Sequence, residues 1–194
     1  MIRRIIALVF TLTVAALLTS CSQSDDAPAV ATSDTVPVAR LGTTVVPERY
    51  EVELRVDPRE ERFSGTTAID LRLNAAVDRI WLHGKDLSVS DVYLITEGGE
   101  RVEASYEERD DTGVALVSLA STAPAGTASL HLEYTAPFNT ATNGLYRTER
   151  GDEAYAATQF QPISARRAFP GFDEPAFKVP FDLSLVTRAG DTSD

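Results

Sequence analysis

YEVELRV, residues 50–56, alternates strictly between apolar and charged side chains. Its apolar members, which run from Tyr50 to Val56 in steps of two, fall on one side of an extended chain. The charged residues between them fall on the other side. A strand with one buried face and one solvated face is typical of an antiparallel sheet. The stretch therefore predicts a half-buried β-strand, and the same pattern extends outward from it.

Further short extended segments follow along the chain, separated by turn signals such as Gly98-Gly99. Gly65, inside the second segment, is expected at a bulge or bend. We find no amphipathic helix longer than two turns and no internal repeat. The pattern predicts an all-β fold, a large twisted antiparallel saddle or β-sandwich-like domain, although the spacing alone also allows an immunoglobulin-like module. The expected strands are 50–56, 63–73, 79–83, 87–95, 101–106, 114–119, 127–134, 144–147, 154–156 and 181–186.

The first residues form a separate unit with a basic start and a short apolar run, which predicts a signal peptide over residues 1–20 rather than a spanning helix. Leu18-Thr19-Ser20-Cys21 resembles a bacterial lipobox, which implies lipidation of Cys21 and a lipid-anchored protein of the cell envelope. Ser22 implies the outer membrane. Residues 21–39 lack aromatics and predict a flexible tether. We expect one folded domain over residues 40–194, truncated at its C-terminal end.

The charge balance limits the classes of partner. The chain carries 18 Lys and Arg against 29 Asp and Glu, a net charge of -11. An acidic surface argues against nucleic acid as a partner and against charge-driven binding to anionic lipid. It is otherwise typical of a solvated surface.

The stretch Thr158–Phe181 (TQFQPISARRAFPGFDEPAFKVPF) is unlike the alternating segments. Its four prolines exclude a long helix or a central strand, and only residues 163–169 allow a short helix after Pro162. The rest predicts an ordered loop anchored by aromatic residues, and long ordered loops are usually functional. We expect its arginine pair, Arg166 and Arg167, to form ion pairs with the acidic pair at 173 and 174.

This stretch resembles a signature of the zinc aminopeptidases of the aminopeptidase N family, in their first, non-zinc domain. Weaker landmarks of that domain occur in the same order at 47–50, 63–65, 81–83 and 144–147. The resemblance implies the family's saddle-shaped β-domain. It also implies a parent enzyme that removes N-terminal residues from peptides with the help of zinc.

The zinc chemistry of the family needs an H-E-x-x-H motif and a further glutamate. The chain holds two histidines, His83 and His131, and neither lies in that motif. The family's G-x-M-E-N segment is also missing, since the sole methionine is Met1. We therefore expect no catalytic residue, no metal ligand and no cofactor in this chain, with zinc belonging to the full-length parent and its catalytic domain.

By the same resemblance, Gln159 and Gln161 stand where the family binds the α-amino group of a peptide. Gln161 replaces a glutamate that is commoner in the family, which implies a weaker hold on the amine. An alternative role for both glutamines is to tie the loop together. The implied partners are peptide N-termini, the catalytic domain and a membrane reached through Cys21. The alternative function is a stand-alone envelope β-sandwich lipoprotein that binds peptides or proteins without catalysis.

Overall fold

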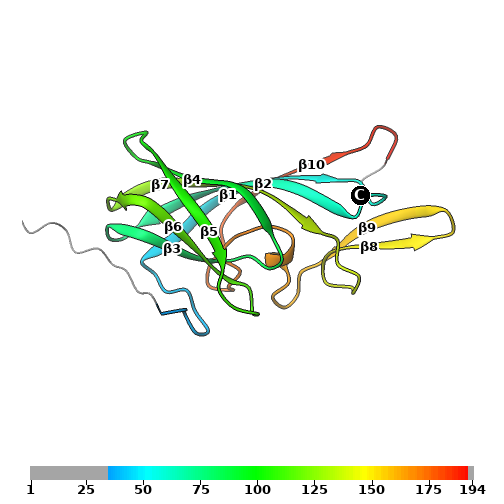
Figure 1. Ribbon diagram of the computed structural model, residues 1–194, viewed down its shortest axis with the longest axis horizontal. Coiled ribbons are helices and arrows are strands. Elements are labelled where there is room, and N and C mark those ends of the chain that lie inside the picture. The colour runs from blue at the N-terminus through cyan, green and yellow to red at the C-terminus, as the bar shows by residue number, and fades with distance from the viewer. Residues whose placement is uncertain (1–34, 192–194) are drawn as a thin grey trace, which may run out of the picture.

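The computed structural model describes residues 35–191, and strands make up nearly all of its regular structure (Figure 1). The one helical element is a short 3₁₀ turn, η1 (Ala165–Arg167). The all-β prediction is confirmed. The strands are β1 (Val45–Val56), β2 (Arg62–Leu73), β3 (Val77–His83), β4 (Ser88–Thr96), β5 (Arg101–Glu108), β6 (Val114–Ala123), β7 (Gly126–Pro137), β8 (Gly144–Arg150), β9 (Glu153–Gln159) and β10 (Phe181–Thr187).

Eight of the strands form one sheet in the order β10-β1-β2-β7-β4-β5-β6-β3, and β8 and β9 form a separate hairpin. All neighbours in the large sheet are antiparallel except β1 and β10, which run parallel. The sheet is therefore mixed and not wholly antiparallel as expected. The parallel pairing follows from the long crossover between β7 and β10, which lets the chain enter β10 at the same end as β1.

The large sheet curls strongly into a half-barrel (Figure 1). Its buried apolar side chains form one core. Tyr50, Val52 and Leu54 of β1 are buried there, as the alternation predicts. They belong to one hydrophobic cluster that also includes Ile80 of β3, at the far end of the strand order, and Leu130 of β7 in the middle. Burial of this shared inner face supplies the main stabilising term of the fold.

Gly65 does not mark a bulge, because β2 keeps a regular register with both neighbours around it. A Cβ at Gly65 would lie 2.6 Å from the Tyr134 hydroxyl and 2.9 Å from the Glu53 carbonyl oxygen. Glycine is needed there for this close approach. The register shift of β1 lies instead between Pro47 and Arg49.

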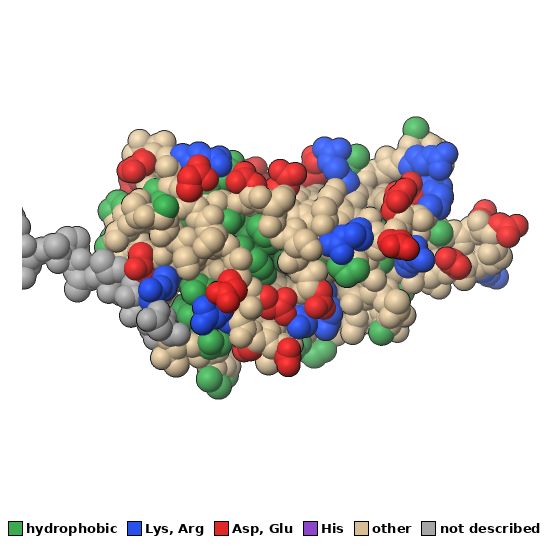
Figure 2. All heavy atoms as spheres, viewed as in Figure 1, with side chains coloured by type: hydrophobic (Ala, Val, Ile, Leu, Met, Phe, Trp, Pro, Cys, Tyr) green, Lys and Arg blue, Asp and Glu red, His purple; other side chains and the backbone are tan. Residues whose placement is uncertain are grey.

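The outer surface carries charged side chains of both signs, interspersed across the face shown in Figure 2. A few form ion pairs between neighbouring strands, such as Arg49 with Asp182 and Arg72 with Glu48. Exposed pairs of this kind contribute about 0–1 kcal/mol each to the stability of the fold, so they are not its main source of stability.

Candidate functional site

The loop of residues 160–180 lies across the opening of the half-barrel and connects its two ends. At β3, His83 and Gly171 exchange two backbone hydrogen bonds, of 2.7 and 2.8 Å. At β1, the Phe172 N–H donates to the Tyr50 hydroxyl oxygen at 2.8 Å, and the Tyr50 N–H donates to the Pro180 carbonyl at 3.0 Å. The loop is therefore an ordered closure, as its proline and aromatic content predicts. The short helix that the sequence allows over 163–169 forms as the 3₁₀ turn η1.

A buried guanidinium holds this loop in place. The Arg166 side chain is 8% exposed and its Nε lies 2.9 Å from Asp173 Oδ2. Its two other nitrogens donate to the carbonyl oxygens of Thr112, at 2.8 Å, and of Asp173, at 3.2 Å. One arginine thus connects two parts of the loop, at residues 166 and 173, and also connects the loop to the turn before β6. A planar fork of donors suits several acceptors at once.

The expected pairing of both arginines with both acidic residues is correct for Arg166 alone. Arg167 donates to Asp86 at 2.6 Å, outside the loop. The Glu174 carboxylate accepts a hydrogen bond from the Leu41 N–H at 2.6 Å. Adjacent side chains point in different directions both in the 3₁₀ turn that holds the two arginines and in the loop after it, so each of these neighbours finds a different partner.

Aromatic rings fix the ends of the loop. Tyr50 stacks on Phe181 with ring centroids 4.3 Å apart, and Phe169 meets the edges of both Phe181 and Phe160. A cavity of about 170 Å³ lies between Tyr50, Phe169, Phe181 and neighbouring residues of the loop. Edge-to-face and stacked rings of this kind favour fixed geometry as well as burial. Phe160, which lies between the two candidate glutamines in the sequence, is anchored by its contact with Phe169.

Gln159 and Gln161 lie at the rim of the half-barrel, where β9 ends and the loop begins. Gln159 pairs with Gly144 of β8 through the backbone, and both glutamine side chains are exposed. Within residues 35–191, neither side chain makes a hydrogen bond, so the structure gives no support to a role in tying the loop together. The arrangement presents two amide groups to solvent on either side of an anchored ring. Such groups can accept hydrogen bonds from an ammonium.

The two histidines lie apart in the fold and take part in different contacts. His83, at the end of β3, is buried, and its Nδ1 accepts a hydrogen bond from the Asp173 N–H at 3.2 Å. Burial, reinforced by the nearby Arg166 charge, lowers the pKa of His83 to about 4. His131 on β7 stacks against Tyr93 at 4.8 Å, and burial lowers its pKa.

The described positions do not supply a donor set for zinc. Among residues 35–191, no group of three or more His, Cys, Asp and Glu side chains is arranged to hold a metal ion. His83 Nδ1 already accepts a backbone hydrogen bond, and His131 is engaged with Tyr93. A protein zinc site needs three or four such ligands. The described residues do not fit zinc, and we derive no metal-dependent step for them.

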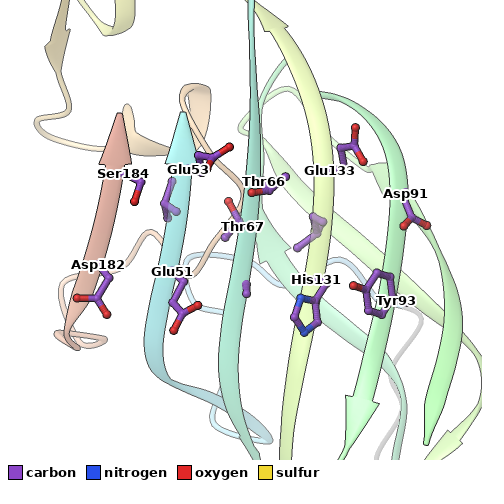
Figure 3. A pocket seen from close by; sticks show the side chains of 13 residues that line it. Glu51, Glu53, Thr66, Thr67, Asp91, Tyr93, His131, Glu133, Asp182 and Ser184 are labelled. Carbon is purple, nitrogen blue, oxygen red and sulfur yellow. The ribbon is translucent and has the colours of Figure 1, made fainter. Parts of the chain in front are cut away.

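A groove of about 400 Å³ crosses the outer face of the sheet (Figure 3). The strand register sets its side chains in two rows across β10, β1, β2, β7 and β4. The alternating pattern alone does not reveal this groove, because it depends on which strands are neighbours, although each outward position follows from the period of two. The rows are Asp182, Glu51, Ala68, His131 and Tyr93, and beside them Ser184, Glu53, Thr66, Glu133 and Asp91.

Arginines around the groove offset much of its negative charge. Arg55 pairs with Glu53 at 2.7 Å, and Arg101 lies 3.6 Å from Asp91 while its guanidinium covers the Tyr93 ring at 3.4 Å. The groove is therefore a charge-compensated surface, and we assign no ligand to it.

Cys21, the signal peptide and most of the tether lie outside the described residues. Within residues 35–191, no helix has the length and apolar character needed to span a membrane.

Comparison with known proteins gives one family and several relatives. Residues 46–193 match the family model described as the Peptidase M1 N-terminal domain. The chain is 32% identical over 161 residues to the puromycin-sensitive aminopeptidase of Caenorhabditis elegans, covering 79% of this chain and 17% of that protein. It is 32% identical over 149 residues to the probable M1 family aminopeptidase 1 of Encephalitozoon cuniculi, covering 75% and 17%. It is 31% identical over 154 residues to aminopeptidase 2, mitochondrial, of Saccharomyces cerevisiae, covering 76% and 16%. The chain thus aligns with about a sixth of the length of these relatives.

Proposed function

This chain belongs to the M1 peptidase family through its N-terminal domain, and from that membership we propose its role. We propose that it is the non-zinc domain of an aminopeptidase that removes N-terminal residues from peptides. In this role it forms one wall of the substrate site and binds the α-amino group of the peptide through Gln159 and Gln161. A separate catalytic domain supplies the zinc ion, which activates water and polarises the scissile carbonyl.

The observation that carries this proposal is the position of two exposed amides around an anchored aromatic ring. Gln159 is held by the β8–β9 hairpin, and Phe160 packs edge-on against Phe169 with centroids 5.9 Å apart. Gln161 follows immediately at the rim. The β8–β9 hairpin holds the backbone before Phe160, and the ring contact with Phe169 holds Phe160 itself. The backbone positions from which the two glutamine side chains extend are therefore fixed, even though the side chains are solvent-exposed. Fixed acceptors reduce the entropy that is lost when a ligand binds.

An ammonium group that leaves water must recover hydrogen bonds, because its desolvation is costly. Each glutamine offers one carbonyl oxygen as an acceptor. Neutral acceptors hold an ammonium less strongly than a carboxylate does, since a charge-assisted bond is roughly twice as strong. We therefore propose that amine recognition by this domain is weak alone and is completed by acceptors of the catalytic domain.

The experiment is an NMR titration of the ¹⁵N-labelled protein with trialanine and with N-acetyl-trialanine. We expect the free amine to shift resonances around Phe160 and the acetylated peptide to do so much less. Gln161→Ala should weaken binding of the free peptide about 2- to 10-fold, the range of one neutral hydrogen bond. Tyr155→Ala is the matched control, because Tyr155 lies on β9, the strand that leads to Gln161, and is 46% exposed.

Gln161→Glu tests the same contact with a change that should strengthen binding. A carboxylate at this position should tighten binding of the free amine, and the gain should disappear below about pH 4 as the glutamate is protonated. Equal binding of both peptides, or an equal effect of Tyr155→Ala and Gln161→Ala, would contradict the proposed recognition of the amine.

We also propose that the protein is held at the bacterial cell envelope, at the outer membrane, by lipid on Cys21. The support is the short apolar leader followed by Leu18-Thr19-Ser20-Cys21. Lipid chains bind a bilayer through buried methylenes, each contributing about 0.8 kcal/mol. Expressed in a two-membrane bacterium, the chain should sediment with outer membranes, and Cys21→Ser should release it into the soluble fraction. Equal distribution of the two forms would refute the anchor.

A further inference from the structure

Strand β9 has one neighbour, β8, and its other edge is unpaired within residues 35–191. The chain is described on both sides of β9, and neither side sends a backbone hydrogen bond to this edge. The hairpin of β8 and β9 extends away from the half-barrel (Figure 1). The strand ends at Gln159, so its free edge leads directly into the proposed amine site.

The register of the hairpin shows which backbone groups face the free edge. On β8, the Leu145 C=O and the Arg147 N–H bond to Asn139, on the side away from β9. Backbone groups alternate between the two sides of a strand, so the even-numbered residues of β8 bond to β9. Their partners on β9 have odd numbers. The residues whose N–H and C=O groups face the free edge are therefore Ala154, Ala156 and Thr158.

Nothing along β9 blocks the addition of a strand at this edge. Sheet edges are usually protected by lysine, proline or a bulge, because unpaired strands associate. Residues 153–159 contain neither lysine nor proline, and their pairing with β8 has no register shift. Three of these seven residues are alanines, whose small side chains leave the backbone open to a close neighbour. The edge can therefore accept an extended chain.

We propose that the occupant is the peptide whose amine binds at Gln159 and Gln161, so this inference rests on the proposed function. The peptide joins β9 as an added strand, and main-chain hydrogen bonds hold it. Because its amine lies at the Gln159 end, the peptide runs toward the hairpin tip, antiparallel to β9. The net charge of -11 favours this occupant, since it attracts a cationic peptide end and repels a second copy of the chain.

One register of this added strand places the amine beside both glutamines. The first residue of the peptide lies opposite Gln159, so its ammonium extends to the level of Phe160, between the two glutamines in the sequence. The second residue then pairs with Thr158, and the fourth with Ala156, through two backbone hydrogen bonds each. A hexapeptide also reaches Ala154 with its sixth residue.

This register favours peptides of four or more residues with an extended N-terminal segment. The side chains of the third and fifth residues lie on the face of β9 that carries Ala157 and Tyr155. Tyr155 is 46% exposed, so an apolar fifth residue gains a cross-strand contact. Trialanine does not reach Tyr155, so Tyr155→Ala should leave its binding unchanged.

The test compares peptides of different length by NMR titration of the ¹⁵N-labelled protein. The hexapeptide Ala-Ala-Ser-Ala-Ser-Ala should bind at least about 10-fold more tightly than trialanine, since each net hydrogen bond contributes about 2- to 10-fold. Methylation of the amide nitrogen of its fourth residue should remove most of this gain. Methylation at the third residue, whose N–H points away from β9, is the matched control and should change binding less than about 2-fold.

Two variants of the protein test the same register. Ala156→Pro removes one donor from the free edge and leaves the hydrogen bonds to β8 in place. It should weaken binding of the tetrapeptide Ala-Ala-Ser-Ala about 2- to 10-fold, the range of one hydrogen bond. Ala154→Pro is the matched control, because the tetrapeptide does not reach Ala154. In the parent protein, the hexapeptide should slow hydrogen exchange of the Ala156 and Thr158 amides.

The outcomes separate this inference from the proposed function. Equal effects of the two methylated hexapeptides would overturn strand addition, and so would a hexapeptide that binds no more tightly than trialanine while the free amine is still preferred. Shifts of the β9 amides with protein concentration alone would assign the edge to a second copy and would also overturn it. An N-acetylated hexapeptide that binds as tightly as the free one, with the same methylation pattern, would support strand addition and contradict recognition of the amine.

Discussion

Replacing Arg166 with alanine tests whether one buried guanidinium holds the closing loop. Its side chain is 8% exposed and that of Asp173 is 19% exposed, with a separation of 2.9 Å. The replacement leaves the Asp173 carboxylate without its cation. It also leaves the Thr112 carbonyl, which accepts from Arg166 at 2.8 Å, without that donor. The loop would lose its connection to the turn before β6.

The magnitude follows from burial. Removing one partner of a fully buried ion pair costs about 3–5 kcal/mol. Since water still reaches Asp173, we expect the free energy of unfolding to fall by about 2–4 kcal/mol. In a domain of this size each kcal/mol corresponds to roughly 2–4 °C, so Tm should drop by about 10 °C.

The assay is urea unfolding followed by fluorescence of Trp81, the single tryptophan, on β3. Arg167→Ala is the matched control, because Arg167 makes an ion pair with the half-exposed Asp86 and should lose less than about 1 kcal/mol. A double-mutant cycle with Asp173→Ala should give a coupling energy of about 1.5–3 kcal/mol, the range for charged hydrogen bonds. Equal losses for Arg166→Ala and Arg167→Ala would refute the clamp.

We make three further predictions from other parts of the structure. Gly65→Ala should destabilise the fold by about 1–3 kcal/mol, because its Cβ would meet Tyr134 at 2.6 Å, and an unchanged urea midpoint would contradict this. His83 has a pKa of about 4 when folded and about 6.5 when unfolded, so the unfolded state binds more protons between these values. Stability should therefore fall by up to about 3 kcal/mol as pH drops from 6.5 to 4, and His83→Asn, which keeps an acceptor, should flatten that slope. The purified chain should show no hydrolysis of aminoacyl reporter substrates and no stoichiometric zinc by metal analysis, and one tightly held zinc per chain would contradict our assignment of the metal to another domain.

The sequence predicts the strands well because a period of two is a local property. Tyr50, Val52 and Leu54 are buried as their spacing requires. The partner of each strand is not a local property, and the parallel pairing of β10 with β1 was missed for that reason. The role of Gly65 was also missed, since it depends on Tyr134, which is distant in sequence.

The site was predictable to a smaller extent. The resemblance alone singled out Gln159 and Gln161, because nothing in the chemistry of an isolated glutamine marks a ligand. The ion pair of Arg166 with Asp173 was expected from residue type and proximity. The bond from Arg167 to Asp86 was not, because Asp86 reaches the loop only after the half-barrel has formed.

The place of β10 beside β1 also sets the order in which the chain can fold. Strand β1 ends at Val56, whereas its second neighbour is complete only at Thr187. At synthesis rates of about 5–20 residues per second, β1 waits roughly 10 s for that neighbour. During this interval the first strand can pair with β2, but its other edge stays open. Pairings between residues so far apart in sequence also slow folding. One edge of β1 thus stays unpaired until β10 has been made.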